Sequence, residues 1–367
     1  MAVAAKGSRD RWTCEESIAE LAQLATTAGA EVVGTLIQQL REPSKTHYVG
    51  KGKLEEIIGL RESIGYNLVI LDDELSPLQQ RNLEEALQVK VIDRVALILD
   101  IFARRAQSHE GRLQVELAQH QYLLPRLAGQ WSHLERLGGG IGTRGPGESQ
   151  LETDRRLIRR KIHRLQAQIE EVRKHRYLYR HRRRKTGIPV VALVGYTNAG
   201  KSTLLNALCR ADVFTEDKLF ATLDPTTRRL ILPDLTTVLI TDTVGFIRKL
   251  PPVIVTAFRA TLEELSEASL LLHVVDLASA DAAEQCQTVE DILRDLDLAA
   301  KPRITVLNKV DLVLSGGESW NEASPLDYFS QYVSTARENM ILVSAQKKWG
   351  LSRLLEQISR MLNQPHQ

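Results

Sequence analysis

The sequence predicts an α/β protein with three parts: a small N-terminal α/β domain, an antiparallel helical hairpin, and a C-terminal α/β domain that carries a phosphate-binding loop. Three observations support this fold class. Strand-length apolar runs alternate with helical patterns in both outer parts, the middle part has an apolar repeat of helical spacing, and a glycine-rich loop follows one C-terminal strand. We place the domains at residues 1–107, 108–186 and 187–367, a division that suits this chain length.

The N-terminal domain is predicted from residues 30–105. Its strands are expected at 32–40, 68–71 and 89–92, and its helices at 54–64, 78–87 and 95–104. This alternation is typical of a small parallel α/β unit. The basic glycine turn at 48–53 has two interpretations: it contacts a phosphate, in RNA or in a second nucleotide such as ATP, or it is a plain tight turn.

The helical hairpin is predicted from two apolar repeats. Spacings of 4, 3, 4 and 3 mark one seam of a coiled-coil-like helix, formed by Ile158, Ile162, Leu165, Ile169 and Val172. A partner helix is expected from Leu113, Leu117, Leu124 and Leu127. The glycine-rich residues 138–147 lie between the two repeats, which predicts an antiparallel pair joined by a flexible tip. Their match to the dinucleotide fingerprint is only formal, because the segment follows a helix and not a strand.

Basic residues are concentrated in the second hairpin helix. Residues 154–185 hold 14 Lys and Arg against three Asp and Glu, a net charge of +11, so the rest of the chain carries −9. A stripe of one sign indicates a polyanionic partner, here RNA, and the alternative is a solvated helix face.

The composition is that of a soluble globular protein, with 43% apolar and 26% charged residues. No apolar run is long enough to span a membrane, and residues 1–11 lack the apolar core of a signal peptide. Cys14, Cys209 and Cys286 are odd in number and lack metal-ligand spacing. We therefore expect a cytoplasmic protein in a reducing compartment, and we expect a monomer.

A phosphate-binding loop occupies residues 195–202, where Gly, four residues and Gly-Lys-Ser follow an apolar run and precede a helix start. Glycines let the backbone wrap a phosphate, and the N–H groups of such a loop and helix favour an anion. Lys201 would reach the β- and γ-phosphates, and Ser202 would ligate Mg²⁺. The predicted phosphate-binding residues are Gly195, Tyr196, Thr197, Asn198, Ala199, Gly200, Lys201, Ser202 and Thr203.

Two later segments are expected at the γ-phosphate. The second of them, here called switch II, ends an apolar run and consists of Asp242, Thr243, Val244 and Gly245. Asp242 would hold Mg²⁺ through water, and the Gly245 N–H would meet the γ-phosphate. The earlier segment, here called switch I, consists of Phe220, Ala221, Thr222, Leu223 and Asp224. A hydroxyl near it should complete the Mg²⁺ shell, with Thr222 as our choice and Thr226 as the alternative. Lys201, Thr222 and Gly245 would then act on the reacting phosphate.

The base is predicted to be guanine from two strand ends. Asn308, Lys309 and Asp311 follow one apolar run, and Ser344, Ala345 and Gln346 follow another. Ligands of open parallel sheets bind at the carboxyl ends of strands. The Asp311 carboxylate can accept hydrogen bonds from guanine N1 and its amino group, whereas adenine would leave it unpaired at a cost of about 1–3 kcal/mol. The expected nucleotides are therefore GTP and GDP.

The order of these motifs resembles that of translation-factor-related GTPases, and further residues resemble the HflX family. They are the glycine-rich block 138–152, the run Asp154-Arg155-Arg156 and the segment 220–226. The resemblance spans about residues 30 to 363. It implies a GTPase that binds the large ribosomal subunit and its RNA and splits or rescues stalled ribosomes, notably under stress. The alternatives are an RNA-binding anti-association factor with little turnover and a ribosome-assembly GTPase.

Catalysis raises a separate question, because Phe246 stands where many small GTPases place a glutamine that orients water. A phenyl ring can neither accept a proton nor align water, so a partner or another group must supply this function. Related GTPases use an Asn at the position of Asn198 to hold K⁺ near the phosphates. The alternative is that Asn198 is a turn residue.

Overall fold

The computed structural model describes the chain apart from residues 6–12, 128–145, 186, 210–218, 250, 258, 315–326, 329–330, 333–334 and 365–367. The chain forms two compact units. The first comprises Met1–Arg104, Arg112–Val172 and Pro251–Ala257, and the second comprises Arg105–Gly111, Arg173–Leu250 and Phe258–Gln367. Both hairpin helices therefore contribute residues to both units.

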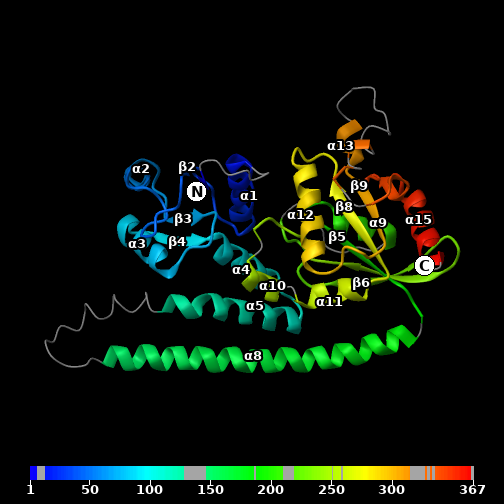
Figure 1. Ribbon diagram of the computed structural model, residues 1–367, viewed down its shortest axis with the longest axis horizontal. Helices are drawn as coiled ribbons and strands as arrows, with labels where there is room; N and C mark the ends of the chain where they lie inside the picture. The colour runs from blue at the N-terminus through cyan, green and yellow to red at the C-terminus, as the bar shows by residue number, and fades with distance from the viewer. Residues whose placement is uncertain are drawn as a thin grey trace. The chain divides into compact units, whose positions relative to one another are not determined.

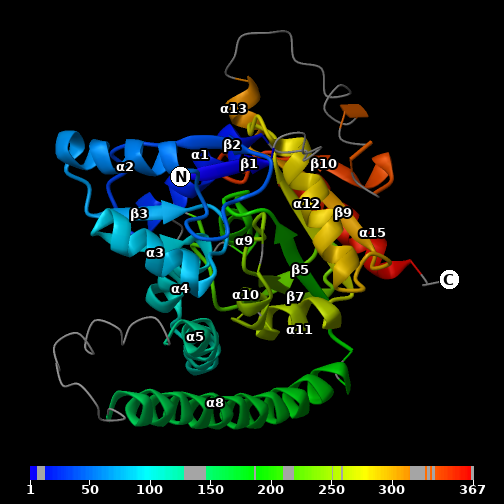
Figure 2. The ribbon, with the colours of Figure 1, turned by 60° about the vertical axis from the view of Figure 1, so that its left-hand side comes forward.

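The first unit contains two short parallel strand pairs and the helices around them. Its elements are β1 (Ala2–Ala5), α1 (Cys14–Thr27), β2 (Ile37–Leu40), α2 (Lys51–Ile64), β3 (Leu68–Leu71), α3 (Pro77–Leu87), β4 (Lys90–Asp93), α4 (Arg94–Arg105) and α10 (Pro252–Ala257). Strand β1 pairs with β2, and β3 pairs with β4. Apolar side chains of α2, α3, β3 and β4 share one core, and Figure 2 shows α2 and α3 beside β3.

The hairpin is built from α5 (His109–Leu123) and α8 (Pro146–Lys185), with the 3-10 turn η1 (Leu124–Arg126) after α5. Its apolar cluster consists of Leu113, Leu117 and Leu165, with Ile162, Ile169 and Val172 partly buried against it. Glu110 of α5 pairs with Arg176 of α8, and Glu116 pairs with Lys161. The two helices therefore run antiparallel, side by side in Figure 1.

The predicted hairpin needs one correction. Helix α5 ends at Leu123, so Leu124 and Leu127 do not continue its apolar seam. Pro125 explains the end, because proline has no N–H to donate and disfavours a helical residue before it. Of the flexible tip expected at 138–147, residues 138–145 lie outside the described residues, whereas Pro146 and Gly147 begin α8. In the described ranges no helix, the long but highly charged α8 included, is apolar enough to cross a membrane.

In the described part of the second unit, six strands form one sheet in the order β10-β9-β8-β5-β7-β6. They are β5 (Val190–Gly195), β6 (Thr226–Ile231), β7 (Thr237–Asp242), β8 (Leu270–Asp276), β9 (Arg303–Asn308) and β10 (Met340–Leu342). Among these six described strands, only the β6–β7 pair is antiparallel. Strands β8 and β9 are buried almost throughout, as apolar central strands are when helices cover both faces of a parallel sheet.

Helices cover both faces of this sheet. They are α9 (Lys201–Cys209), α11 (Arg259–Glu267), α12 (Ala282–Asp295) and α15 (Leu351–Asn363). The short α13 (Val310–Leu314) follows the end of β9, and the 3-10 turn η2 (Arg337–Asn339) precedes β10. Apolar residues of α9 and α15 share a core with the sheet, whereas α12 packs on a separate cluster through Ala282 and Cys286. Figure 1 shows α12 and α15 on opposite sides of the sheet. The carboxyl ends of the parallel strands meet at one edge, where ligands of such sheets bind.

The predicted α/β fold class is confirmed. Strands β5 to β10 lie within three residues of the apolar runs at 190–195, 229–232, 237–241, 270–275, 303–307 and 341–343 from which they are predicted. The strand expected at 32–40 is wrong in its first half, since β2 begins only at Ile37. Val32 and Val33 are exposed coil residues. Their β-branched side chains favour a strand, but they do not pair with a neighbouring strand in the structure. Strand β1 and helix α1 were not predicted.

Candidate functional site

The glycine-rich loop lies between β5 and α9 in the second unit. Strand β5 is central in the sheet, and its buried apolar side chains fix the start of the loop. Asn198 and Gly200 both adopt left-handed conformations, with φ of 61° and 91°, which fold the chain back before α9 begins at Lys201. The loop therefore presents backbone N–H groups and a helix N-terminus together, an arrangement that binds anions.

Lys201 is buried at the mouth of this loop. Its Nζ donates hydrogen bonds to the carbonyl oxygens of Tyr196, at 2.6 Å, and Gly195, at 3.2 Å. Burial lowers the pKa of Lys201 to about 8, although nearby Asp242 opposes the shift. A desolvated ammonium of this kind gains most from an anionic ligand.

Three side-chain oxygens converge beside Lys201. The Ser202 hydroxyl donates to Asp242 Oδ2 at 2.5 Å, and the Thr222 hydroxyl donates to the same atom at 3.0 Å. The two hydroxyl oxygens are 2.8 Å apart. The three residues come from α9, switch I and the end of β7, so the cluster joins segments that are 20 and 40 positions apart.

Asp242 is fully buried, and its hydrogen bonding is incomplete. Burial raises the pKa of its carboxyl group, against the opposing effects of Ser202, Lys201 and Thr222. Its Oδ1 atom has no hydrogen-bond partner among the described residues, and neither does the Thr197 hydroxyl. Buried polar atoms without partners are rare and call for a ligand, ion or water.

The oxygen cluster fits Mg²⁺. This ion takes oxygen ligands and is usually bound by one or two protein groups together with waters and substrate phosphates. One carboxylate and two hydroxyls match that donor set. No group of three or more His, Cys, Asp and Glu side chains that could hold a metal occurs in the described residues.

Switch II is tied to the phosphate-binding loop through its backbone. Phe246 N donates to Gly195 O at 3.0 Å, and Thr197 N donates to Phe246 O at 2.8 Å. A Cβ atom at Gly245 would lie 2.7 Å from Thr197 Cα and 2.9 Å from Lys201 Nζ, so only glycine fits there. The Phe246 side chain is buried and provides packing without any group that could activate water.

A small cleft surrounds these groups. It is lined by Thr197, Asn198, Gly200, Lys201, Ser202, Thr203, Phe220, Ala221, Thr222, Thr243 and Gly245. Thr243 was predicted only as part of the switch II motif, and its hydroxyl donates to Leu193 O at 2.5 Å, which fixes switch II to β5. The alternative residue Thr226 begins β6 opposite Asp242, whereas the hydroxyl contact to Asp242 comes from Thr222.

Asn308 connects three loops at the strand ends. Its Nδ2 donates to Ala199 O in the phosphate-binding loop at 2.9 Å, and its Oδ1 accepts from Ala345 N at 3.0 Å. Lys309 pairs with Asp276 at 2.6 Å. Asp276 was missed as a site residue, although it ends β8 directly beside Asn308 in the parallel register. The sequence did carry a signal for Asp276, because the apolar runs of β8 and β9 both end in a polar residue.

The other predicted base-binding residues lie on the same edge. Asp311 is buried in the first turn of α13, directly after β9. Ser344 and Ala345 are buried after β10, which neighbours β9, and Gln346 is exposed. The Ser344 hydroxyl accepts from Lys347 N at 3.0 Å. The structure thus gathers phosphate-binding and base-binding candidates along one sheet edge.

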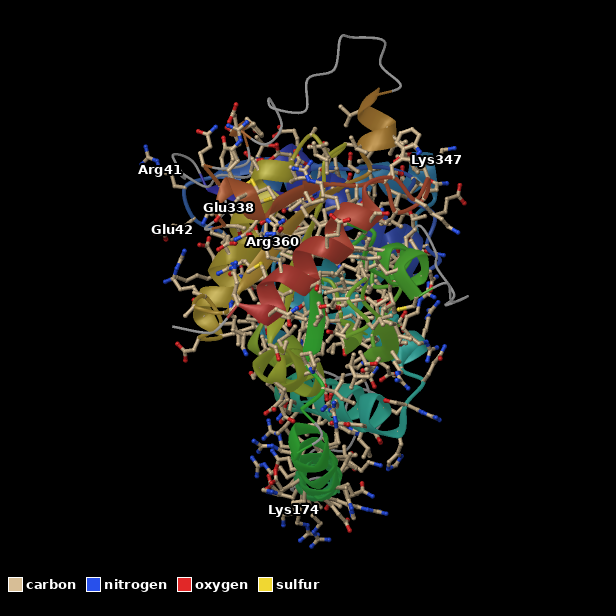
Figure 3. All side chains as sticks on the ribbon, turned by 90° about the vertical axis from the view of Figure 1, so that its right-hand side faces the viewer. Arg41, Glu42, Lys174, Glu338, Lys347 and Arg360 are labelled. Atoms are coloured by element: carbon tan, nitrogen blue, oxygen red, sulfur yellow. The ribbon has the colours of Figure 1, made fainter. Side chains whose placement is uncertain are left out.

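The basic stripe of α8 is only partly exposed to solvent. Arg156, Arg159, Arg160 and Arg164 are exposed, and Figure 3 shows Lys174 among nitrogen-tipped side chains that extend outward from α8. Lys161, Arg173 and Arg176 instead form ion pairs with Glu116, Glu263 and Glu264. Nothing is described of the side chains at 177–185. Ion pairs therefore take up some of the predicted positive charge. Among the side chains that the structure describes, four arginines stay exposed on the N-terminal half of α8, and Lys174 is exposed further along.

The glycine turn of the first unit makes internal contacts. Tyr48 OH donates to Asp73, and Gly50 N donates to Gln38 Oε1 at 3.0 Å. Lys53 pairs with Glu56 at 2.7 Å. These contacts are those of a structured tight turn at the start of α2. A second nucleotide at this turn would have to compete with these internal contacts.

Three family models match successive parts of the chain. One described as GTP-binding GTPase N-terminal matches residues 15–103, and one described as GTP-binding GTPase Middle Region matches residues 105–183. A third, described as 50S ribosome-binding GTPase, matches residues 190–309. The last range begins at β5 and ends just after Asn308, so it contains both switches and the phosphate-binding loop.

Individual relatives are similar over nearly the whole chain. A GTPase HflX from Caldanaerobacter subterraneus subsp. tengcongensis is 55% identical over 348 residues, covering 95% of this chain and 77% of that protein. The GTPase HflX of Escherichia coli is 44% identical over 351 residues, covering 95% and 79%. A GTP-binding protein from Sulfolobus solfataricus, solved in complex with GDP, aligns with a TM-score of 0.50 at 25% identity, over 98% of this chain and 97% of that one.

Proposed function

The chain belongs to the GTPase HflX family and is a GTP hydrolase, and from that premise we propose that it acts on the large ribosomal subunit. There it would split or rescue stalled ribosomes under stress. Two parts of this proposal rest on particular residues: the chemistry rests on the oxygen cluster of Ser202, Thr222 and Asp242, and the ribosome contact rests on the exposed arginines of α8.

The oxygen cluster is the observation that carries the chemistry. Ser202 and Thr222 would be the protein ligands of Mg²⁺, and Asp242 would hold it through water, as in other phosphate-binding-loop proteins. Bound there, Mg²⁺ would neutralise charge on the β- and γ-phosphate oxygens. Because Thr222 lies in a loop and Ser202 in a helix, this arrangement makes switch I sensitive to the γ-phosphate.

The remaining residues orient the nucleotide. Lys201 would add positive charge at the β- and γ-phosphates, and the Gly245 N–H would donate to the γ-phosphate. Asp311 and the Ala345 backbone would recognise guanine, held in register by Asn308. Asn198 adopts the left-handed conformation of a turn residue, and its use of K⁺ stays a prediction.

Efficient hydrolysis would require a partner. The buried Phe246 cannot orient water, and groups supplied by a partner are worth about 10³–10⁵ in rate in other GTPases. The same feature favours the alternative of an RNA-binding anti-association factor with little turnover. A second nucleotide at the glycine turn of the first unit also stays a prediction. It would require the Gly50 N–H to exchange its hydrogen bond to Gln38 for one to a phosphate.

Sedimentation with ribosomes tests this function. The protein is incubated with 70S ribosomes and with large subunits under GTP, GDP and a non-hydrolysable GTP analogue. We expect co-sedimentation with the large subunit in the GTP and analogue states, and release of free subunits. Equal binding to the large subunit with all three nucleotides, together with no stimulation of GTP hydrolysis by ribosomes, would favour the anti-association alternative.

A matched pair of variants tests the basic stripe. Arg159→Glu with Arg160→Glu reverses two exposed charges on α8, and Arg41→Glu with Arg360→Glu reverses two exposed charges elsewhere; Figure 3 labels Arg41 and Arg360. Only the first pair should weaken large-subunit binding, with a log–log salt slope lower by roughly 0.7–0.9 per lost phosphate contact. Equal behaviour of the two pairs would make the stripe a solvated helix face.

A further inference from the structure

Asp224 of switch I is bonded to the start of a hairpin helix. Its Oδ2 accepts hydrogen bonds from Gln107 N at 2.8 Å and from Ser108 N at 2.7 Å, and its Oδ1 accepts from the Ser108 hydroxyl at 2.5 Å. The Ser108 hydroxyl in turn accepts from Gly111 N at 2.8 Å, as an N-cap residue does. Residues 105–111 and Asp224 belong to the same compact unit, so this contact is internal to the GTPase unit.

Gly111 gives an independent sign that this contact is built into the sequence. Glycine is less favourable than alanine in a helix, yet it occupies the first turn of α5. A Cβ atom at Gly111 would lie 2.2 Å from Asp224 Oδ1 and 3.0 Å from the Ser108 hydroxyl. The glycine is therefore required by the approach of Asp224.

The start of α5 is also held on its other side. Arg176 of α8 donates to both carboxylate oxygens of Glu110, at 3.0 and 3.1 Å, and to Glu264 of α11 at 2.5 Å. These three residues belong to the second unit too. Ser108 is thus part of an anchored turn, which can hold Asp224 in place.

Thr222 and Asp224 cannot move independently. They are two residues apart, and Leu223 between them is buried. Thr222 bonds to Asp242 while Asp224 bonds to the start of α5. A movement that withdraws one of these side chains must strain or break the contact of the other.

We propose that Ser108 and the first turn of α5 position switch I for GTP, through Asp224, so that Thr222 is held over Ser202 and Asp242. This inference rests on the proposed role of Thr222 at the γ-phosphate. Ser108 is a positioning residue, since it does not line the phosphate cleft and acts through Asp224. Coupling of this kind is reciprocal, so GTP binding also strengthens the hold of switch I on α5.

Affinity for two nucleotides tests the proposal. Gly111→Ala introduces the methyl group that would displace Asp224, and Ser108→Ala removes the hydroxyl that bonds to it. GDP and a non-hydrolysable GTP analogue are titrated with Mg²⁺ present. Both variants should bind the analogue roughly 5–150-fold more weakly, the usual range of such coupling, and should bind GDP as the unchanged protein does. Ser108→Thr, which keeps the hydroxyl, should restore analogue binding.

A matched control separates this effect from helix stability. Gly59 lies inside α2, and a Cβ atom there meets nothing within 4 Å, so Gly59→Ala should leave both affinities unchanged. The double variant Ser108→Ala with Thr222→Ala should bind the analogue no more weakly than Thr222→Ala alone, because the two changes act through one contact.

The outcomes also separate this inference from the proposed function. If Thr222→Ala weakens analogue binding selectively but Gly111→Ala and Ser108→Ala do not, the positioning role is wrong and the sensor role of Thr222 stands. If Thr222→Ala loses GDP and analogue equally, the sensor role fails and the positioning role fails with it. Equal loss of both nucleotides in Ser108→Ala would assign Ser108 a purely structural role.

Discussion

Both compact units place aspartates at the carboxyl ends of parallel strands, but the two sets of carboxylates have different surroundings. In the first unit, Asp93 ends β4 and accepts from Tyr122 OH at 2.9 Å, Arg126 Nη2 at 3.2 Å and two backbone N–H groups. In the GTPase unit, Asp242 ends β7 and receives two hydroxyls on one oxygen, while the other oxygen has no partner in the described part of the chain.

This difference distinguishes a carboxylate with a structural role from one that can still accept a ligand. Asp72 resembles Asp93, since it accepts from Ser17 Oγ at 2.6 Å and from Arg94 Nη1 at 2.7 Å. Buried ion pairs of this kind satisfy the carboxylate fully. Incomplete bonding combined with a pKa shifted by burial is instead typical of a functional site. A position at a strand end therefore identifies candidate site aspartates. The completeness of their hydrogen bonding shows which of them have a structural role and which can bind a ligand.

The largest expected effect is on the stability of the first unit. Asp93→Ala leaves the buried Arg126 guanidinium with only the half-exposed Glu74, 3.6 Å away, as its anionic partner. The loss of the buried partner should lower the free energy of unfolding by about 3–5 kcal/mol. Urea unfolding followed with and without GDP gives the measurement, because GDP should shift only the transition of the GTPase unit. A change below about 1 kcal/mol would mean that Asp93 is not the structural counterpart of Asp242.

Asp242→Asn should show the reverse pattern. Burial raises the pKa of this carboxyl group above its value in the unfolded chain, so the charged form is disfavoured by folding and its removal should not lower stability at neutral pH. Loss of the charge should nevertheless weaken Mg²⁺-dependent GTP binding by more than about tenfold. Titrations of GTP affinity against Mg²⁺ concentration measure this effect. A variant with a lower free energy of unfolding but normal GTP binding would mean that Asp242 has a structural role.

The sequence alone predicted most of the GTPase unit and less of the first unit. Strands β5, β7, β8 and β9 are apolar runs that lead into polar segments, so their bounds followed from local patterns. Asp242 and Asn308 followed in the same way, whereas Asp276 at the end of β8 was missed. Helix α1 was missed although Thr13 and Glu16 form a capping box, a local signal that could have identified it. The bond between Asp224 and Ser108 spans 116 positions, and no local pattern encodes such a contact.

Base recognition should change by an intermediate amount. Asp311→Asn replaces an acceptor that guanine needs, at a cost of about 1–3 kcal/mol, or roughly 5- to 150-fold in affinity for GTP. Xanthine nucleotides should gain relative to GTP. Calorimetric titration with both nucleotides measures the ratio, and unchanged affinity for GTP would remove Asp311 from the base site.

The smallest effect should be on the pH dependence of nucleotide binding. The Lys201 pKa is lowered to about 8 by burial, so the free protein loses this positive charge as the pH rises through that value. Nucleotide phosphates favour the charged form, so binding near pH 8 should take up a proton, and affinity should fall severalfold between pH 7 and pH 9. Calorimetry in buffers of different ionisation enthalpy would detect the uptake, and its absence would place Lys201 away from the phosphates.

The most direct test is a crystal structure of the protein with Mg²⁺ and a non-hydrolysable GTP analogue. The comparison predicts the ion bound directly by the Ser202 and Thr222 hydroxyls, with Asp242 beside it through water. It also predicts that Asp72 and Asp93 keep their bonds to Arg94 and Arg126. A metal held by other residues, or a bound nucleotide with Thr222 turned away from it, would contradict the proposed roles of Ser202, Thr222 and Asp242.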